Sequence, residues 1–488
     1  QTLTGDADYP DDWGRRANPV PFLESITFQL NSSMSAGDST IAVTVDGRSS
    51  NALPLRINER GSIYFLDANA RGAEDGSFEA PWSDPRDFIS AMAPGDVVYL
   101  REGTFDERYN GGKDVIWFRD TNTSGTARDP IGVVAYPGET VIIDGVTDGD
   151  RSNFNGGIRT TNEHMTIAKL TIRALSRAVN VPGDFNRIVA NDVVGNLVHI
   201  AGAGNVHSGA NGTVILGNAV HGARSDNRLD HAIYIDGCQE RVPSEVAYNH
   251  SYDNFVNRGP MMSENHQLTR CDDDVHQLAT QWHHNLVDCS YRGAEGFTAA
   301  DARSRSFQIF DMSWDEEPGE TEPEPALVYN NITYRCGRGG HGNFSHGNGH
   351  AHFFNNLAWE NLGSCLHMSE GTNSAPRITT RFFNNVCHQA DESSDAYVTE
   401  NPIEARKLFE HNVFVGGRNG GIPASASGTI TEDPQITVDI DAYTPVVIAE
   451  SSPLIGAGTN DVSDVVTNDF FGRPRTDGYD IGAVQSSD

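Results

Sequence analysis

Basic residues are scarce in this sequence. The chain of 488 residues holds 35 Lys and Arg against 67 Asp and Glu, a formal net charge of -32 at pH 7. A surface this acidic repels nucleic-acid phosphates and anionic lipids, so we expect no nucleic-acid partner. No apolar run approaches the roughly 18 residues of a membrane-spanning helix, so we expect no membrane insertion either.

Metal and cofactor motifs are missing as well. The cysteines are six single residues with no CxxC pair, which argues against a structural zinc site: Cys238, Cys271, Cys289, Cys336, Cys365 and Cys387. They either pair as disulfides or remain buried thiols. No Gly-rich motif follows a strand and opens a helix, so we expect no organic cofactor. A chain that starts at Gln1 fits a processed protein and predicts a secreted or surface-exposed location.

Turn-forming residues are abundant, with 49 Gly and 22 Pro. That content is too high for a helix bundle. Hydrophobic residues make up 37% of the chain, which is enough for a core. The composition therefore predicts an all-β, turn-rich protein, and we expect a monomer.

One short pattern recurs along the chain: an apolar stretch, an Asn, and another apolar stretch. Successive copies lie 27, 31, 36, 46, 25, 29 and 27 residues apart and centre on Asn191, Asn218, Asn249, Asn285, Asn331, Asn356, Asn385 and Asn412. A shortest gap that recurs, with some longer gaps between copies, is typical of a solenoid in which some coils carry loop insertions.

The pattern predicts how each coil is built. Short strands alternate with tight bends, and an Asn at a bend can adopt left-handed backbone angles and bond neighbouring backbone. Stacked coils would align the Asn residues and bury a continuous apolar column that includes the pairs Phe353–Phe354 and Phe382–Phe383. We therefore predict a right-handed parallel β-helix over residues 59–470, with an N-terminal cap, a small N-terminal β segment over 1–58 and a closing segment over 471–488.

Several stretches resemble known proteins. PGDVVYLREGTF and GTARDPIGVVAYPGETVIIDG resemble the opening coils of secreted β-helix polysaccharide lyases and their relatives. SSPLIGAG and DFFGRPRTDGYDIGAVQ resemble the closing segment of many such proteins, and SITFQL with STIAVTVDG and SSNALPLRI resembles part of an IPT/TIG module. The resemblance implies the β-helix fold and a polysaccharide-degrading activity.

Histidine points to the middle coils, because 15 of the 17 His residues lie between His199 and His388. Side chains that exchange protons near neutral pH suit an acid–base site. In HAIYIDG, alternation directs Ile233 and Ile235 inward and Tyr234 and Asp236 to solvent. The catalytic candidates are His231, Tyr234, Asp236, Arg292, Glu295 and His341.

Further candidates would bind substrate or metal. Arginine grips acidic groups in a bidentate manner and glycine opens a groove, which favours as substrate ligands His199, Arg303, Arg305, His346 and His367. The run CDDDVH offers hard oxygen ligands for calcium in Asp272, Asp273 and Asp274, and a solvated acidic loop is the alternative.

Three functions remain open. A lyase that cleaves an acidic, uronate or sulfated, polysaccharide by β-elimination needs a base, an acid and a cation; Tyr234 or His231, His341 and Arg292 would fill these roles. The chain has only Lys113, Lys169 and Lys407 and no Asn-Lys-Ser motif, which disfavours the Lys-dependent lyases. A glycoside hydrolase would use paired carboxylates, such as Asp236 with Glu295. A non-enzymatic adhesin would need only the groove.

Overall fold

The structure is a computed structural model. It describes residues 14–17, 20–27, 34–45, 47–58, 60–106, 114–119, 123–146, 156–174, 177–196, 203–208, 211–222, 224–225, 230–236, 242–256, 261–264, 280–290, 306–310, 324–337, 344–347, 351–369, 379–390, 395, 397–399, 407–418, 422–476 and 478–486.

Three long parallel sheets form the coils, and the chain visits the first, second and third sheet once per coil. The first sheet has the strands β10 (Asp114–Phe118), β13 (Gly156–Thr160), β16 (Val179–Asn180), β19 (Ala203–Ser208), β23 (Asp230–Asp236), β27 (Met261–Glu264), β30 (Phe307–Phe310), β33 (Phe344–Gly347), β36 (Leu366–Ser369) and β39 (Tyr397–Thr399). Every neighbouring pair within it is parallel.

The second sheet has the strands β7 (Ile63–Leu66), β8 (Val97–Leu100), β11 (Ile131–Ala135), β14 (Met165–Ala168), β17 (Arg187–Val189), β20 (Val214–Leu216), β24 (Glu245–Ala247), β28 (Gln281–His283), β31 (Ala326–Tyr329), β34 (Ala351–Phe354), β37 (Thr380–Phe383) and β40 (Lys407–Glu410). The third has β9 (Gly103–Phe105), β12 (Val141–Asp144), β15 (Thr171–Ala174), β18 (Asp192–Asn196), β21 (Ala219–His221), β25 (His250–Tyr252), β29 (Leu286–Asp288), β32 (Ile332–Tyr334), β35 (Leu357–Asn361), β38 (Val386–Gln389) and β41 (Val413–Val415). A short parallel pair, β22 (Arg224–Ser225) and β26 (Phe255–Val256), lies beside them.

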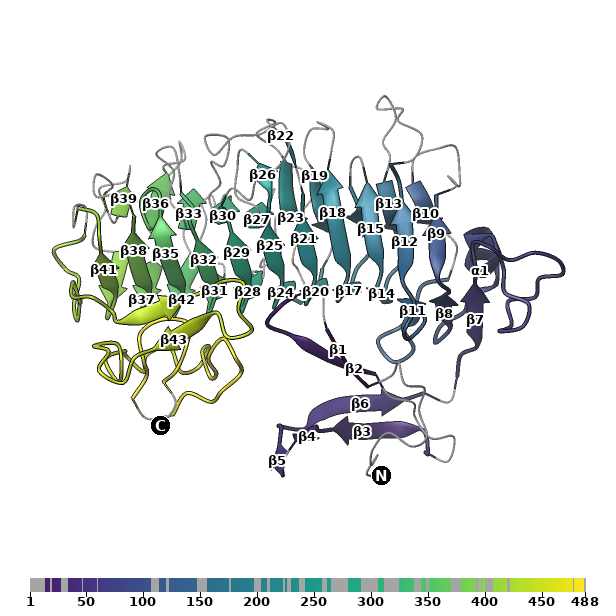
Figure 1. Ribbon diagram of the computed structural model, residues 1–488, viewed down its shortest axis with the longest axis horizontal. Helices are drawn as coiled ribbons and strands as arrows, with labels where there is room; N and C mark the ends of the chain where they lie inside the picture. Colours follow the sequence, from purple (N-terminus) through teal and green to yellow (C-terminus); the bar gives the residue numbers. More distant parts are fainter. Residues whose placement is uncertain are drawn as a thin grey trace, which may run out of the picture.

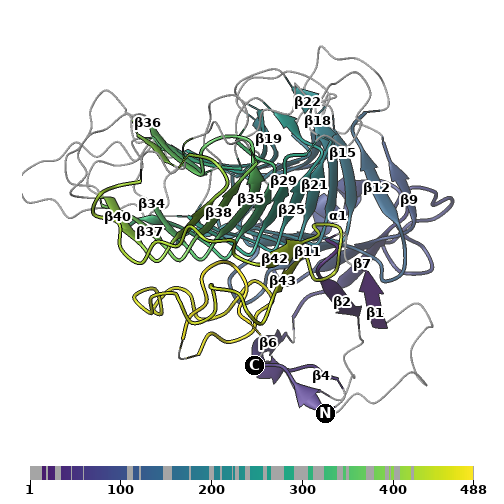
Figure 2. The same cartoon turned by 60° about the vertical axis from the view of Figure 1, so that its left-hand side comes forward.

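This topology confirms the predicted parallel β-helix. The coils stack from β7 and β8 at one end to β39, β40 and β41 at the other (Figure 1). The turned view in Figure 2 separates β36 of the first sheet from β34 and β37 of the second, with the coil interior between them. The domain boundaries remain predictions, but the strands of the three sheets occupy only Ile63–Val415 of the span 59–470.

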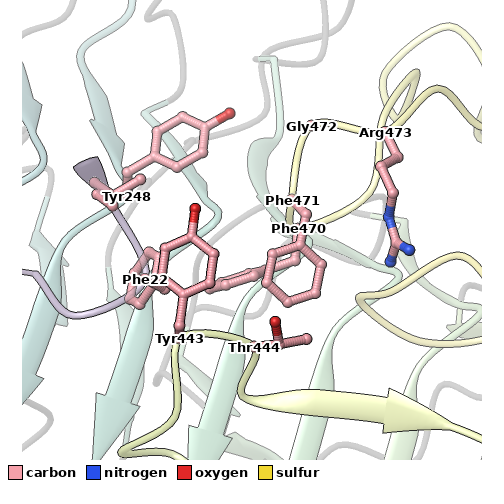
Figure 3. A pocket seen from close by; sticks show the side chains of 9 residues that line it. Phe22, Tyr248, Tyr443, Thr444, Phe470, Phe471, Gly472 and Arg473 are labelled. Carbon is pink, nitrogen blue, oxygen red and sulfur yellow. The ribbon is translucent and has the colours of Figure 1, made fainter. Parts of the chain in front are cut away.

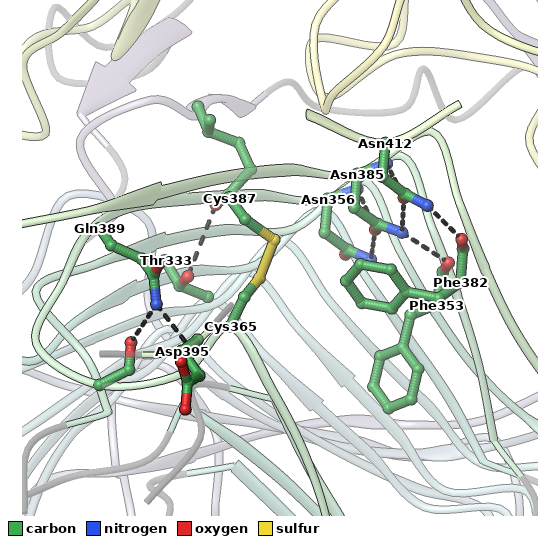
Figure 4. Close-up of a disulfide and its surroundings, with 12 residues drawn as sticks. Thr333, Phe353, Asn356, Cys365, Phe382, Asn385, Cys387, Gln389, Asp395 and Asn412 are labelled. Atoms are coloured by element: carbon green, nitrogen blue, oxygen red, sulfur yellow. Dashed lines mark hydrogen bonds between the residues drawn. A yellow bond between two sulfur atoms is a disulfide. The ribbon is translucent and has the colours of Figure 1, made fainter. Parts of the chain in front are cut away.

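The predicted Asn residues form one continuous ladder, of which Figure 4 draws Asn356, Asn385 and Asn412. Each side-chain Nδ2 donates to Oδ1 of the Asn one coil further on, over distances of 2.9–3.1 Å from Asn191 to Asn412. Each Nδ2 also donates to a backbone carbonyl of the second sheet, such as that of Ile188 for Asn218 at 2.9 Å. All eight are fully buried, so the ladder satisfies polar groups that water cannot reach.

The backbone at the bend differs from the prediction. The left-handed residue is the one before each ladder Asn, not the Asn itself. These residues have φ between 50° and 65°: Ala190, Gly217, Tyr248, His284, Asn330, Asn355, Asn384 and His411. The sequence analysis assigned both roles to the Asn, but two adjacent residues share them: the first has the left-handed backbone and the Asn makes the hydrogen bonds.

Residues 422–430 continue the stack with parallel bridges to the last coil, and the C-terminal segment that follows, up to residue 486, packs on the outside of the coils (Figure 1). It begins with the antiparallel pair β42 (Ile436–Val438) and β43 (Val446–Ile448). Left-handed residues of five successive coils bond its backbone carbonyls: His284 to Asp469, Asn330 to Asn468, Asn355 to Asp480, Asn384 to Thr459 and His411 to Ala457. The segment therefore follows the bend and covers these coils.

Alternation along the strands splits the aromatic pairs that we expected to point inward together. Phe353 and Phe382 lie in the main core. Phe354 and Phe383 belong to a second cluster with Val462, Val466 and Tyr479 of the C-terminal segment. Neighbouring strand residues point to opposite faces, so only one Phe of each pair can reach the core.

The N-terminal end is closed by α1 (Pro85–Ala91). Its N-cap residue Asp84 accepts a hydrogen bond from the backbone N–H of Arg86 at 2.8 Å, and Phe88 lies in the main core. The segment before it has the antiparallel pairs β1 (Gly14–Ala17) with β2 (Glu24–Thr27), β3 (Gly37–Ile41) with β6 (Leu53–Ile57), and β4 (Thr44–Val45) with β5 (Arg48–Ser49). Residues Ser25–Thr27, at the start of SITFQL, thus pair with β1.

Four cysteines form disulfides, which decides between the two alternatives for them. Cys289 pairs with Cys336, and Cys365 pairs with Cys387 (Figure 4). Cys238 and Cys271 lie outside the described residues. Each bond joins neighbouring coils and restricts the unfolded chain, which stabilises the stack.

Candidate functional site

One row of residues runs along the first sheet in backbone register, at positions that alternate with the core residues, and we call it the outward row. From β10 to β39 its positions are Trp117, Arg159, Asn180, His207, Tyr234, Met262, Gln308, Ser345, His367 and Val398. The adjacent positions, such as Ile158 and Ile233, fill the core. Because strands lie about 4.8 Å apart, the row extends for roughly 40 Å.

Tyr234 lies in the middle of this row on β23. Its ring stacks on His231 of the same strand, with centroids 5.3 Å apart and an interplanar angle of 14°. Ile233 and Ile235 are buried in the core as predicted. Tyr234 itself is only 5% exposed and His231 only 2%, so the expected solvent-facing position of Tyr234 is wrong. The structure brings a phenol and an imidazole together in a place largely shielded from water.

Two other predicted residues can be placed by backbone register. Asp236 at the end of β23 pairs with Glu264 on β27, so two carboxylate residues occupy adjacent coils. His346 on β33 pairs in register with Ile309 on one neighbouring strand and with Met368 on the other. The side chains of Ile309 and Met368 are both buried. The structure describes only the backbone of Asp236, Glu264 and His346.

His367 lies on β36 in the same outward row as Tyr234 and is 8% exposed. Four strand spacings separate the two residues, which is about 19 Å. They can therefore contact different sugars of one extended chain but cannot form one acid–base pair.

The remaining predicted site residues lie outside the described residues: His199, Arg292, Glu295, Arg303, Arg305 and His341, and the calcium candidates Asp272, Asp273 and Asp274. Within the described part of the chain, no group of three or more His, Cys, Asp or Glu could hold a metal ion. The same part contains no helix long and apolar enough to span a membrane.

Sequence reasoning missed the arginine-rich end of the row. Trp117 on β10 has Arg159 of the next coil over its ring at 5.0 Å and Arg119 at 4.9 Å. No histidine marks this end. Trp117 and Arg159 are 42 positions apart in the sequence and become neighbours only through the strand register. The only signal in the sequence was the alternation of residues along the two strands DVIWF and GGIRT, which contain Trp117 and Arg159.

A second cluster of titratable groups lies under the C-terminal segment. His284 Nε2 lies 2.9 Å from the carbonyl oxygen of Asp469, which can only accept. His284 therefore donates from Nε2, and its Nδ1 accepts from Nδ1 of His283 at 2.7 Å. His283 Nε2 lies 3.1 Å from a carboxylate oxygen of Glu245, so Glu245, His283, His284 and the carbonyl of Asp469 form one hydrogen-bonded chain.

Burial shifts the pKa values in this cluster. Burial lowers the pKa of His284 well below its usual value and raises the pKa of Tyr248 to about 12. The hydrogen bond from His283 lowers the pKa of Glu245, against its partial burial. Burial lowers the pKa of Arg475 to about 10, with its guanidinium bonded to Asn330 and to the carbonyls of Asp480 and Gly482. The bonds from His284 to Asp469 and from Arg475 to Asn330 join the coils to the segment, which assigns the cluster to docking of the segment.

A cavity of about 330 Å³ lies beside this cluster (Figure 3). Its lining comes from the N-terminal segment, one coil and the C-terminal segment: Phe22, Leu23, Tyr248, Tyr443, Thr444, Phe470, Phe471, Gly472 and Arg473. Arg473 is already paired with Asp469 at 2.7 Å. The lining is mainly aromatic, so the first sheet offers the better acid–base arrangement.

The docking cluster predicts the direction of the pH dependence of stability. The folded-state pKa of His284 lies below its unfolded value near 6.5, so the unfolded chain binds the extra proton and stability falls as the pH drops below about 6.5. Glu245, with its lowered pKa, adds a further loss at more acidic pH. We expect the melting temperature to fall from pH 7.5 to pH 5.5, and to fall less in His284→Gln. His164→Gln, another left-handed turn residue, is the control and should keep the wild-type slope.

The comparisons with known proteins support the fold. No protein-family model matches the sequence, and no curated protein matches it. Among solved structures, the pectate lyase Pel9A matches with a TM-score of 0.53 and 15% identity over 88% of this chain and 98% of that chain. A complex of XylC with xylose matches with a TM-score of 0.47, 9% identity and coverage of 87% and 98%. A rhamnogalacturonan lyase matches with a TM-score of 0.42, 13% identity and coverage of 85% and 99%.

At these identities the likeness shows the fold alone. The Pel9A match spans almost the whole of that chain and most of this one, so the parallel β-helix is shared over nearly its full length. Function has to be argued from the residues of the first sheet.

Proposed function

We propose that this protein is a polysaccharide lyase that cleaves an acidic polysaccharide by β-elimination on the outward face of the first sheet. The observation that carries the proposal is the row from Trp117 to His367 with the Tyr234–His231 stack at its middle. A long row of side chains suits an extended polymer, and the stacked phenol and imidazole supply groups for proton transfer. The name of Pel9A, a pectate lyase, agrees with this reaction class.

The reaction assigns a role to each group. Tyr234 or His231 takes the proton from C5 of a uronate. The electron pair of the broken C5–H bond forms the C4=C5 double bond, and the C4–O bond breaks. The leaving oxygen takes a proton from an acid, for which we propose His341, while Arg292 binds the uronate carboxylate. The low exposure of Tyr234 and His231 keeps water from the proton transfer. His199, Arg303, Arg305, His346 and His367 remain proposed substrate ligands.

Hydrolysis is the second candidate, favoured by one observation. Asp236 and Glu264 occupy paired positions on neighbouring strands, which lie about 4.8 Å apart. Retaining glycosidases hold two carboxyl groups roughly 5–5.5 Å apart. Asp236 with Glu264, or with Glu295, could then act as nucleophile and acid.

One experiment separates the candidates. The protein is incubated with polygalacturonate, alginate and a sulfated galactan, and two signals are followed: the absorbance of the unsaturated sugar and the number of reducing ends. We expect both signals to rise together on a uronate polymer. Reducing ends without absorbance would show hydrolysis, and binding without either signal would show an adhesin.

We also propose that the protein is secreted or held at the cell surface, acts as a monomer and uses no organic cofactor. The disulfides Cys289–Cys336 and Cys365–Cys387 support this location, because disulfides persist in oxidising compartments. Calcium at Asp272, Asp273 and Asp274 stays a prediction.

A further inference from the structure

The end of the outward row at β10 gathers positive charge in an acidic protein. Arg159 and Arg119 each lie about 5 Å from the centre of the Trp117 ring, so their guanidinium carbons are within about 10 Å of each other. Neither arginine forms an ion pair within the described part of the chain. By contrast, Arg101, Arg173 and Arg335 each have a carboxylate partner.

The chemistry of the contact leaves these guanidinium groups available. A cation–π contact orients a guanidinium group without using its N–H donors. Moreover, Nε of Arg159 and Nε1 of Trp117 are both buried, and neither has a hydrogen-bond partner among the residues that the structure describes. A buried donor without a partner costs free energy, and two neighbouring cations repel each other. An oxyanion bound between the two guanidinium groups would offset this repulsion.

We propose that Trp117, Arg119 and Arg159 form a subsite for the carboxylate or sulfate group of an acidic saccharide at the β10 end of the row. The inference rests on the proposed function for its ligand class, and it adds a specificity site remote from the reacting bond. Tyr234 lies four strand spacings from Trp117, about 19 Å, so the subsite would hold a distal sugar. Arginine suits this role because its planar donors match carboxylate and sulfate oxygens.

The test measures binding separately from cleavage. The probes are a galacturonate tetrasaccharide, a sulfated galactan tetrasaccharide and an uncharged galactan tetrasaccharide, titrated calorimetrically. We expect wild type to bind one of the charged probes, and Arg119→Gln/Arg159→Gln to weaken that binding about 10- to 100-fold with no effect on the uncharged probe. The lysine variant of both positions should bind between the two, because it keeps the charge and loses the planar donors.

Arg335→Gln is the matched control, since Arg335 follows β32 of the third sheet and its charge pairs with Glu360 at 2.7 Å. It should bind as wild type does, and circular dichroism checks that all variants fold. Equal affinity of the double variant and wild type for both charged probes would overturn the subsite. If wild type binds through these arginines but yields no product from any polymer, the subsite stands and the lyase proposal fails. If wild type binds no charged probe, the subsite is wrong even where cleavage is seen.

Discussion

Tyr234→Phe should lower the rate of uronate elimination by about 10²- to 10⁴-fold, the range that a positioned acid or base contributes. The substitution removes only the phenolic oxygen and keeps the ring that stacks on His231. The fold and the binding row should therefore persist, and kcat should fall far more than KM changes. The initial rate of absorbance increase on the cleaved polymer, with kcat and KM determined separately, measures this.

The third sheet provides a matched control. Tyr252 stacks on His221 with centroids 4.6 Å apart and an interplanar angle of 11°, the same kind of pair on a different face. Tyr252→Phe should keep full activity. Glu295→Gln and Asp236→Asn should harm hydrolysis more than elimination, so a loss in these two alone would favour the hydrolase. Full activity in Tyr234→Phe would remove the reaction from this part of the row.

The architecture could be predicted from sequence because one physical requirement repeats in every coil. A buried bend needs an amide that donates and accepts, and Asn satisfies it at eight positions from Asn191 to Asn412. What the repeat did not reveal was the path of the C-terminal segment. Yet the residue before the ladder Asn is polar in five coils, as in His284 and Asn330, and apolar or Gly in others, as in Ala190 and Gly217. The polar residues are those that bond the segment.

The site was harder to predict because its members come from different coils. Alternation placed Ile233 and Ile235 in the core correctly, but it could not show that Tyr234 is covered and stacked on His231. Histidine enrichment led away from Trp117 and Arg159, which meet only through strand register. Coil lengths differ because of insertions, so residues that face one another cannot be paired by counting along the sequence.

Asn331→Ala should lower the free energy of unfolding by about 3–5 kcal/mol, because it leaves several buried polar groups without partners. Asn331 Oδ1 accepts from the backbone N–H and from Nδ2 of Asn285, and its own Nδ2 donates to the carbonyls of Trp282 and Tyr329 and to Asn356. Asn331 has no exposed surface, so bulk solvent does not reach these groups in the folded protein. Thermal and urea unfolding followed by circular dichroism measure the loss.

The exposed Asn460 provides the control, and Asn460→Ala should change the free energy of unfolding by less than about 0.5 kcal/mol. Asn331→Asp distinguishes lost bonds from lost volume, because it keeps the size and the acceptor but removes the donor and buries a charge. Its destabilisation should diminish as the pH falls and the buried carboxyl becomes protonated. If Asn331→Ala is as stable as Asn460→Ala, the ladder does not stabilise the stack, and packing of the coils alone holds it together.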